Sequence, residues 1–171
     1  FVSISPQQGV VVLDLSMDDI SDHFELRVAL ECFVVSSLAG HLNVDQKSRL
    51  KANLEEQRDC VDNGDMDRTV DLDGSFHLLL TEFLGNREIS RVMWQLRDKM
   101  HRVIQRIHSR HPERLATNYP EHLKVAEAIL EGNPEKAAAA MESHLMNGRQ
   151  FLMSPRPRNQ SVPYRGRQRD N

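Results

Sequence analysis

The sequence predicts an all-α protein, an antiparallel bundle of about six to seven helices preceded by a short β-hairpin. Three observations predict this class. From Ser16 onward, apolar residues recur at steps of three and four, the period of an amphipathic helix. Capping residues and Gly-Asn pairs divide that stretch into helix-sized segments. The 171 residues, 39% of them hydrophobic, suffice for one domain with a sizeable core.

Composition narrows the function classes further. The chain has 22 Lys and Arg against 25 Asp and Glu, a net charge of -3. This charge gives no general electrostatic reason to expect that the segment binds nucleic acid by itself. No apolar run approaches twenty residues, so we expect a soluble, cytoplasmic protein without a membrane span. Cys32 and Cys60 are too few for a disulfide scaffold and lack Cys-x-x-Cys spacing, as expected in a reducing compartment.

The first fourteen residues differ from the rest. Residues 1–4 alternate in polarity, residues 6–9 read Pro-Gln-Gln-Gly, and residues 10–13 form a β-branched run, which together predict a hairpin. Two short strands are not stable alone, so they either pack on the helical body or belong to an upstream module. We favour the module, and the absence of an initial methionine leads us to expect a polypeptide that extends upstream.

The first two helices are predicted from their caps. Ser16 and Asp19 form a capping box ahead of a helix that runs to about Gly40. Asn43 begins a second box, and the polar helix that follows stops near Asn63-Gly64.

Four further helices complete the bundle. We expect the third over 66–84 and the fourth over about 87–110. Tyr119-Pro120 opens the fifth, which stops at Gly132-Asn133, and the sixth starts at Pro134, a favoured first position, and reaches about residue 153. Residues 154–171 carry five arginines and one acid with little to bury, which predicts a flexible basic tail.

One pair of residues suggests metal chemistry. Asp73 and His77 are four positions apart, so a carboxylate and an imidazole share one helix face among apolar neighbours, where they need a partner. His122 and His144 lie on two other helices and could converge with them. Three imidazoles and one carboxylate suit Zn²⁺ or Ni²⁺. The alternative is that these histidines only pack between helices.

The usual enzyme motifs are missing. No glutamate lies three positions before a histidine, and the His-Glu-x-x-His, Gly-x-Ser-x-Gly, P-loop and Gly-x-Gly-x-x-Gly patterns are absent. We therefore assign no catalytic residue. Arg97, His101, Ile104 and His108 recur at helical spacing, so they either line one wall of a cavity or form a solvated face.

Four separated blocks together resemble a known family. They are residues 24–31, residues 73–77 with Gly85-Asn86, residues 121–133, and residues 137–145. In order and spacing they resemble the FCD-type effector domain of GntR-family bacterial transcription regulators, over about Leu15 to Leu152.

The resemblance implies an organisation and a function. Residues 15–153 would be an effector-binding and dimerisation domain whose bundle encloses a metal and effector cavity, and 1–14 the end of the wing of an otherwise absent winged helix-turn-helix. The implied metal ligands are Asp73, His77, His122 and His144, with Zn²⁺ preferred and Ni²⁺ second. A homodimer would bind a small carboxylate metabolite as effector, and operator DNA through the absent domain.

The resemblance also places Arg27 at the effector pocket, where a guanidinium would grip a carboxylate. Arg97 and His108 join it as candidate effector-binding residues. A simple ion pair between Arg27 and Glu31 is the alternative. The effector would favour one arrangement of the dimer and so bias the DNA-binding modules. The competing function is a helical-bundle metalloenzyme that uses the Asp/His₃ site to activate water.

Overall fold

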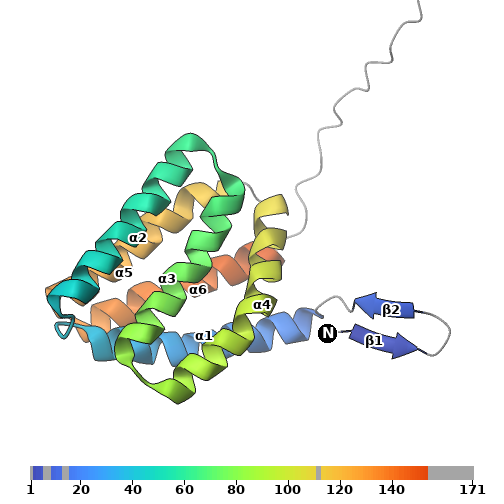
Figure 1. The fold of residues 1–171 in the computed structure, drawn as a ribbon, viewed down its shortest axis with the longest axis horizontal. Helices are drawn as coiled ribbons and strands as arrows, with labels where there is room; N and C mark the ends of the chain where they lie inside the picture. Colours follow the sequence, from blue (N-terminus) through green and yellow to red (C-terminus); the bar gives the residue numbers. More distant parts are fainter. Residues whose placement is uncertain (1, 6–8, 13–15, 111–112, 154–171) are drawn as a thin grey trace, which may run out of the picture.

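A computed structural model describes residues 2–5, 9–12, 16–110 and 113–153 of the chain (Figure 1). Side chains are described over 16–65, 68–97, 101 and 117–151. The described residues form six helices, which confirms the predicted all-α class: α1 (Met17–Leu38), α2 (Val44–Asn63), α3 (Met66–Leu84), α4 (Arg87–Arg110), α5 (Glu113–Glu131) and α6 (Pro134–Met153). The predicted basic tail lies outside the described residues.

Two short strands precede the bundle. β1 (Val2–Ser5) pairs antiparallel with β2 (Gly9–Val12), with Val2 opposite Val12. None of the contacts described for these strands joins them to a helix, so they do not pack on the helical body.

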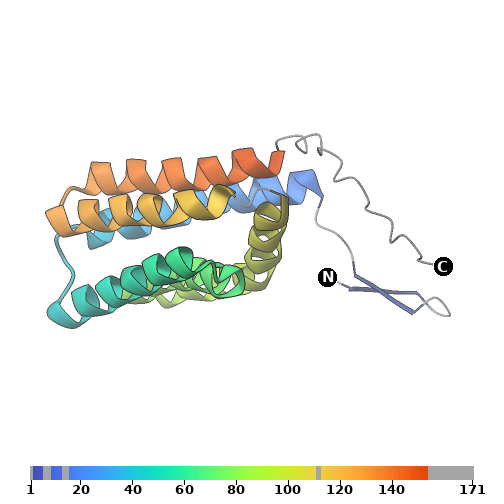
Figure 2. The ribbon, with the colours of Figure 1, turned by 90° about the horizontal axis from the view of Figure 1, so that it is seen from above.

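The helices form two layers (Figure 2). α1, α5 and α6 pack together as one layer, and α2 and α3 lie in the other; α4 begins beside α3 and crosses toward the first layer, where it contacts α1, α5 and α6. α1 and α5 each contact α3 across the layers, and the interface is filled by fully buried side chains: Val34, Val35, Phe76, Leu80, Val125, Ile129, Met141 and Leu145. Burial of such surface is the main stabilising term in folding, so this interface holds the layers together.

The helix starts follow the predicted capping chemistry. At α1 the Ser16 hydroxyl accepts from the Asp19 backbone N–H, and the Asp19 carboxylate accepts from the Ser16 backbone N–H. Asn43 and Gln46 make the same reciprocal pair at α2. These bonds satisfy N–H groups that the first turn of a helix leaves unpaired.

The predicted start of the fifth helix was wrong. α5 begins at Glu113, six residues before Tyr119, and Pro120 lies inside it. Proline is common in a first turn because it has no backbone N–H to leave unpaired, but here it removes one bond from an established helix. The extensive packing of α5 against α6 offsets that loss.

A close backbone contact joins the two loops at one end of the bundle. The Gly40 N–H donates to the Ile129 carbonyl over 2.9 Å, and a Cβ on Gly40 would lie 3.3 Å from the Gly132 Cα. Both glycines have positive φ, 77° and 72°. The contact fixes the end of α1 against the turn between α5 and α6, and so fixes the histidines that α5 and α6 carry.

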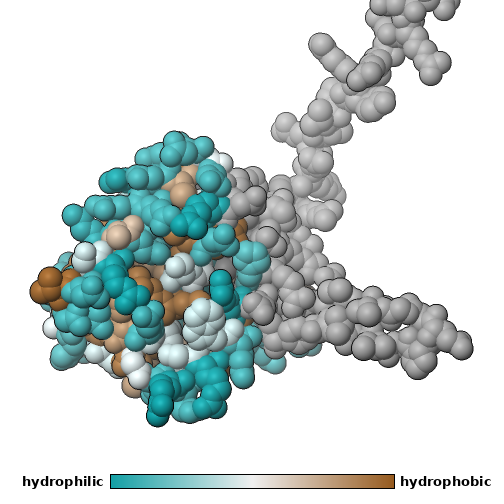
Figure 3. All heavy atoms as spheres, in the orientation of Figure 1, coloured by the Kyte–Doolittle hydropathy of each residue, from teal (hydrophilic) through white to brown (hydrophobic). Residues whose placement is uncertain are grey.

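The surface is mostly polar on the face drawn in Figure 3, with apolar side chains scattered across it. Phe33 and Trp94 are more than half exposed. Among the described residues, the helices are too short or too polar to traverse a bilayer.

Candidate functional site

Three helices bring one carboxylate and three imidazoles to a single point in the core. Asp73 and His77 project from successive turns of α3, His122 comes from α5 and His144 from α6. All four side chains are buried, and their ligand atoms lie within 4.8 Å of one another. The structure thus brings together the four residues that the sequence singled out as metal ligands.

The distances between these atoms match those around a tetrahedral metal ion. The Nε2 atoms of His122 and His144 are 3.2 Å apart, and those of His144 and His77 are 3.3 Å apart. His122 Nε2 lies 3.7 Å from Asp73 Oδ1. Ligands at about 2.0–2.1 Å from zinc lie about 3.3 Å from one another in a tetrahedron. Two of the three distances match this value, and the third is a few tenths of an ångström longer.

Carboxylates fix the orientation of two imidazoles. His77 Nδ1–H donates to Glu31 Oε2 over 2.5 Å, and His144 Nδ1–H donates to Glu121 Oε2 over 2.8 Å. An ionised carboxylate can only accept, so each ring donates from Nδ1. The Nε2 atoms therefore face the cluster, where each can bind a cation through its lone pair when it carries no proton.

Two side-chain amides fix the orientation of the third imidazole, that of His122. Gln57 Nε2 donates to Asn53 Oδ1 over 2.6 Å, which leaves Gln57 Oε1 to accept from His122 Nδ1–H over 2.8 Å. The His122 ring also stacks on Phe76, with centroids 4.0 Å apart. His122 Nε2 therefore faces the cluster as well.

The Asp73 carboxylate is held by a neighbour from α5. Asn118 Nδ2 donates to Asp73 Oδ1 over 2.7 Å, and both side chains are buried. Three imidazole lone pairs and a carboxylate that converge in a dry core repel one another unless a cation lies among them. Metal-bound histidines in proteins show this same pattern of Nδ1–H donated to a fixed acceptor. The residues present therefore fit a divalent transition metal.

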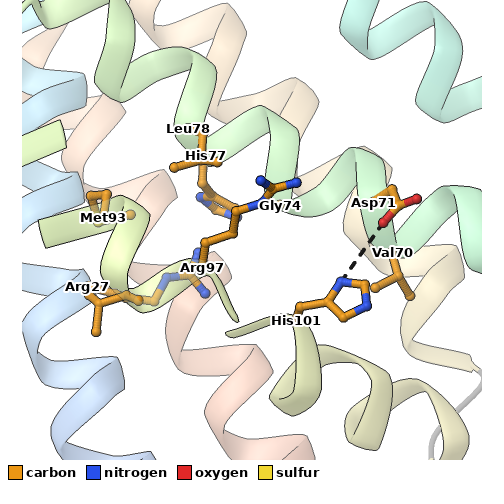
Figure 4. Close-up of a pocket in the computed structure, with 10 residues that line it drawn as sticks. Arg27, Val70, Asp71, Gly74, His77, Leu78, Met93, Arg97 and His101 are labelled. Carbon is orange, nitrogen blue, oxygen red and sulfur yellow. Dashed lines mark ion pairs between the residues drawn. The ribbon is translucent and has the colours of Figure 1, made fainter. Parts of the chain in front are cut away.

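A pocket adjoins the cluster on the side of α1, α3 and α4 (Figure 4). His77 forms part of its wall, so the pocket and the cluster share this residue. Its polar lining includes Arg27, Arg97 and His101, and His101 Nδ1 lies 3.9 Å from Asp71 Oδ1. The remaining lining is Asp71, Val70, Gly74, Leu78, Met93 and Leu96, so one carboxylate also faces the pocket. The two arginines give the pocket a place where a small anion can bind.

Arg27 forms the ion pair that the sequence offered as one alternative, and its contact with an effector stays a prediction. Its Nε donates to Glu31 Oε1 over 2.5 Å, the i,i+4 ion pair, and its side chain also lines the pocket. The residue is only 4% exposed, and none of its described contacts uses the two Nη nitrogens. A nearly buried guanidinium with unused donors at a pocket wall is suited to a carboxylate, which it can grip with two bonds.

The other predicted effector residues fall in different places. Arg97 is exposed at the pocket edge, with its guanidinium 5.0 Å from the centre of the Trp94 ring. The side chain of His108 lies outside the described residues. His101, which the sequence left between cavity wall and solvated face, lines the pocket.

The residues that support the imidazoles were not predicted from the sequence. Glu31 and Gln57 occupy core-facing positions of α1 and α2, where a polar residue is out of place. A polar residue at a core-facing position was the sequence signal that could have identified them.

Burial acts to raise the pKa of Glu31, but Arg27 and His77 outweigh it and lower the pKa to about 2. Glu31 is therefore ionised at neutral pH.

A model of the FCD domain family matches residues 22–147 of the chain. The HTH-type transcriptional repressor RspR of Escherichia coli K12 is 27% identical over 150 residues, which are 84% of this chain and 63% of RspR. The HTH-type transcriptional repressor NanR of Escherichia coli is 29% identical over 129 residues, 72% of this chain and 47% of NanR. The chain thus spans less than two thirds of these relatives.

A solved structure shares the fold. Escherichia coli McbR/YncC superposes with a TM-score of 0.79 at 16% identity, over 88% of this chain and 76% of that one. These comparisons do not support the assignment of residues 1–14 to the wing of a DNA-binding domain, because the family match begins at residue 22. The hairpin forms, but nothing in the matched region identifies its origin.

Proposed function

Since the chain belongs to the FCD domain family of GntR-type transcription regulators, which are not enzymes, we propose that it is a metal-dependent domain that binds a small carboxylate effector. The metal would be held by Asp73, His77, His122 and His144. The observation that carries this proposal is the orientation of the three imidazoles, whose Nε2 lone pairs converge at 3.2–3.3 Å. The nitrogen-rich donor set favours Zn²⁺, with Ni²⁺ as the second candidate.

The carboxylate would bind between the metal and Arg27. This placement is supported by the pocket lining, which includes both His77 and Arg27. A bound metal would supply a Lewis-acidic centre for a carboxylate or hydroxyl oxygen. Arg27 would fix the other end of the anion through its Nη donors, with Arg97 closing the exposed side.

Thermal denaturation tests both parts of this proposal. The metal-free chain is expected to gain about 8–16 °C in apparent Tm on saturation with zinc, since a ligand at about 1,000 times its Kd adds about 4.1 kcal/mol. A set of small carboxylates is expected to raise Tm further only when zinc is present. Matched neutral amides serve as the control. Equal Tm with and without zinc would contradict the metal site.

A homodimer would connect the effector to DNA binding. Leu26 and Phe33 are 40% and 55% exposed and lie seven residues apart, so they share one face of α1. We assign this apolar face to a second copy of the chain. Phe33→Glu is expected to halve the mass measured by light scattering. An unchanged mass at the same concentration would place the dimer contact elsewhere.

DNA binding is proposed for a further domain of the same regulator. The chain covers 63% of RspR, and its described residues hold the helical bundle and one hairpin. We place the effector domain at 15–153 and treat 1–14 as its connection to a DNA-binding domain, in a cytoplasmic protein. The chain alone is expected to leave operator DNA unshifted in an electrophoretic assay that the full-length regulator shifts.

A further inference from the structure

One carboxylate joins the pocket to the imidazole cluster. Glu31 Oε1 accepts from Arg27 Nε over 2.5 Å, and Glu31 Oε2 accepts from His77 Nδ1–H over 2.5 Å. All three residues are at most 4% exposed. Hydrogen bonds that share one buried carboxylate polarise each other, so a change at one oxygen is felt at the other.

The two ends of this chain of contacts lie at different parts of the site. Arg27 lines the pocket and keeps its Nη donors unused among the described contacts, whereas His77 turns Nε2 into the cluster. Glu31 itself does not line the pocket. It therefore touches the arginine and the imidazole without being placed to touch a ligand in that pocket.

We infer that Glu31 is a positioning residue that couples anion binding at Arg27 to the strength of His77 as a metal ligand. An anion bound to the Nη groups of Arg27 neutralises part of the guanidinium charge and weakens the ion pair between Arg27 and Glu31. The carboxylate then accepts a stronger hydrogen bond from His77 Nδ1–H, and this makes the Nε2 atom of His77 a stronger ligand for a metal. This coupling rests on the proposed function, and it is reciprocal, so metal and anion strengthen each other's binding.

The chain contains an internal control for this coupling. His122 Nδ1–H donates to the neutral amide of Gln57, whose other described bond goes to Asn53. Neither amide contacts Arg27 in the described structure. His122 thus has the same kind of support at Nδ1 as His77, but its acceptor is not bonded to Arg27 among the described contacts, so its Nδ1 should respond less.

The test uses the ¹⁵N NMR resonances of the imidazole rings in the metal-free chain. Titration of the wild-type chain with acetate is expected to move His77 Nδ1 and leave His122 Nδ1 in place. Arg27→Met is expected to move the same resonance in the same direction without acetate. In Glu31→Gln, acetate is expected to leave His77 unmoved. The titration of the wild type requires no substitution, so it holds even if a variant folds poorly.

Zinc affinity provides the second readout. Arg27→Met is expected to change the zinc Kd about fivefold more in the wild-type background than in Glu31→Gln. Additive effects in this double-mutant cycle, or equal shifts of His77 and His122, would overturn the coupling. A wild-type chain that binds no zinc would instead contradict the proposed function, and the NMR response of His77 would then decide the role of Glu31 by itself.

Discussion

The His144→Ala variant is expected to lose more than about 100-fold in zinc affinity and to be purified without metal, while the wild-type chain carries about one zinc ion. His144 Nε2 lies within 3.3 Å of the Nε2 atoms of both His122 and His77, so its removal opens the centre of the cluster. Mass spectrometry of metal content, on protein purified without an affinity tag, measures the outcome.

Two controls make this result specific. His77→Ala is expected to behave like His144→Ala, although the two residues come from different helices. His41→Ala removes an exposed imidazole and should retain full metal content. Metal that persists in both cluster variants, or is lost equally from the His41 variant, would return the four residues to a packing role.

Arg27→Met is expected to weaken carboxylate binding by about 30-fold or more while zinc is retained. Loss of one partner of a buried charged contact costs about 2–5 kcal/mol, and Arg27 is the nearly buried cation of the pocket. Isothermal titration of the zinc-loaded chain with the carboxylate that most raises its Tm gives the affinity directly.

The matched control is Arg49→Met. Arg49 also pairs with a glutamate, Glu82, over 3.0 Å, but it is substantially exposed and does not line the pocket that contains His77. Its loss removes the same charge without touching that pocket. Equal weakening in the two variants would show that net charge, not the donors of Arg27, attracts the anion.

Most of the helical framework was predictable because its signals are local. Caps at Ser16 and Asn43, and glycines after α2 and α3, mark helix boundaries within a few residues of chain. The start of α5 was not predictable in this way. Pro120 gives a local signal for a first turn, but packing of α5 on α6 decides the outcome.

In the candidate site, too, local features were predictable from the sequence and long-range contacts were not. The i,i+4 spacing of Asp73 and His77 makes this pair predictable from the sequence. Their proximity to His122 and His144 depends on how three helices pack together. The supporting residues are harder still, because Glu31 lies 46 positions from His77 in the chain. The one sequence signal for Glu31 is a charged residue at a core-facing position of α1, and this signal does not identify His77 as its partner.

The burial of the cluster has a consequence for exchange rates. His122 is fully buried, and Asp73, His77 and His144 are at most 5% exposed. The pocket that His77 lines would be the path by which a bound metal exchanges without separation of the helices. A carboxylate in that pocket would block this path. The anion would then slow metal loss as well as strengthen metal binding, so the metal would exchange fastest from the domain that holds no effector.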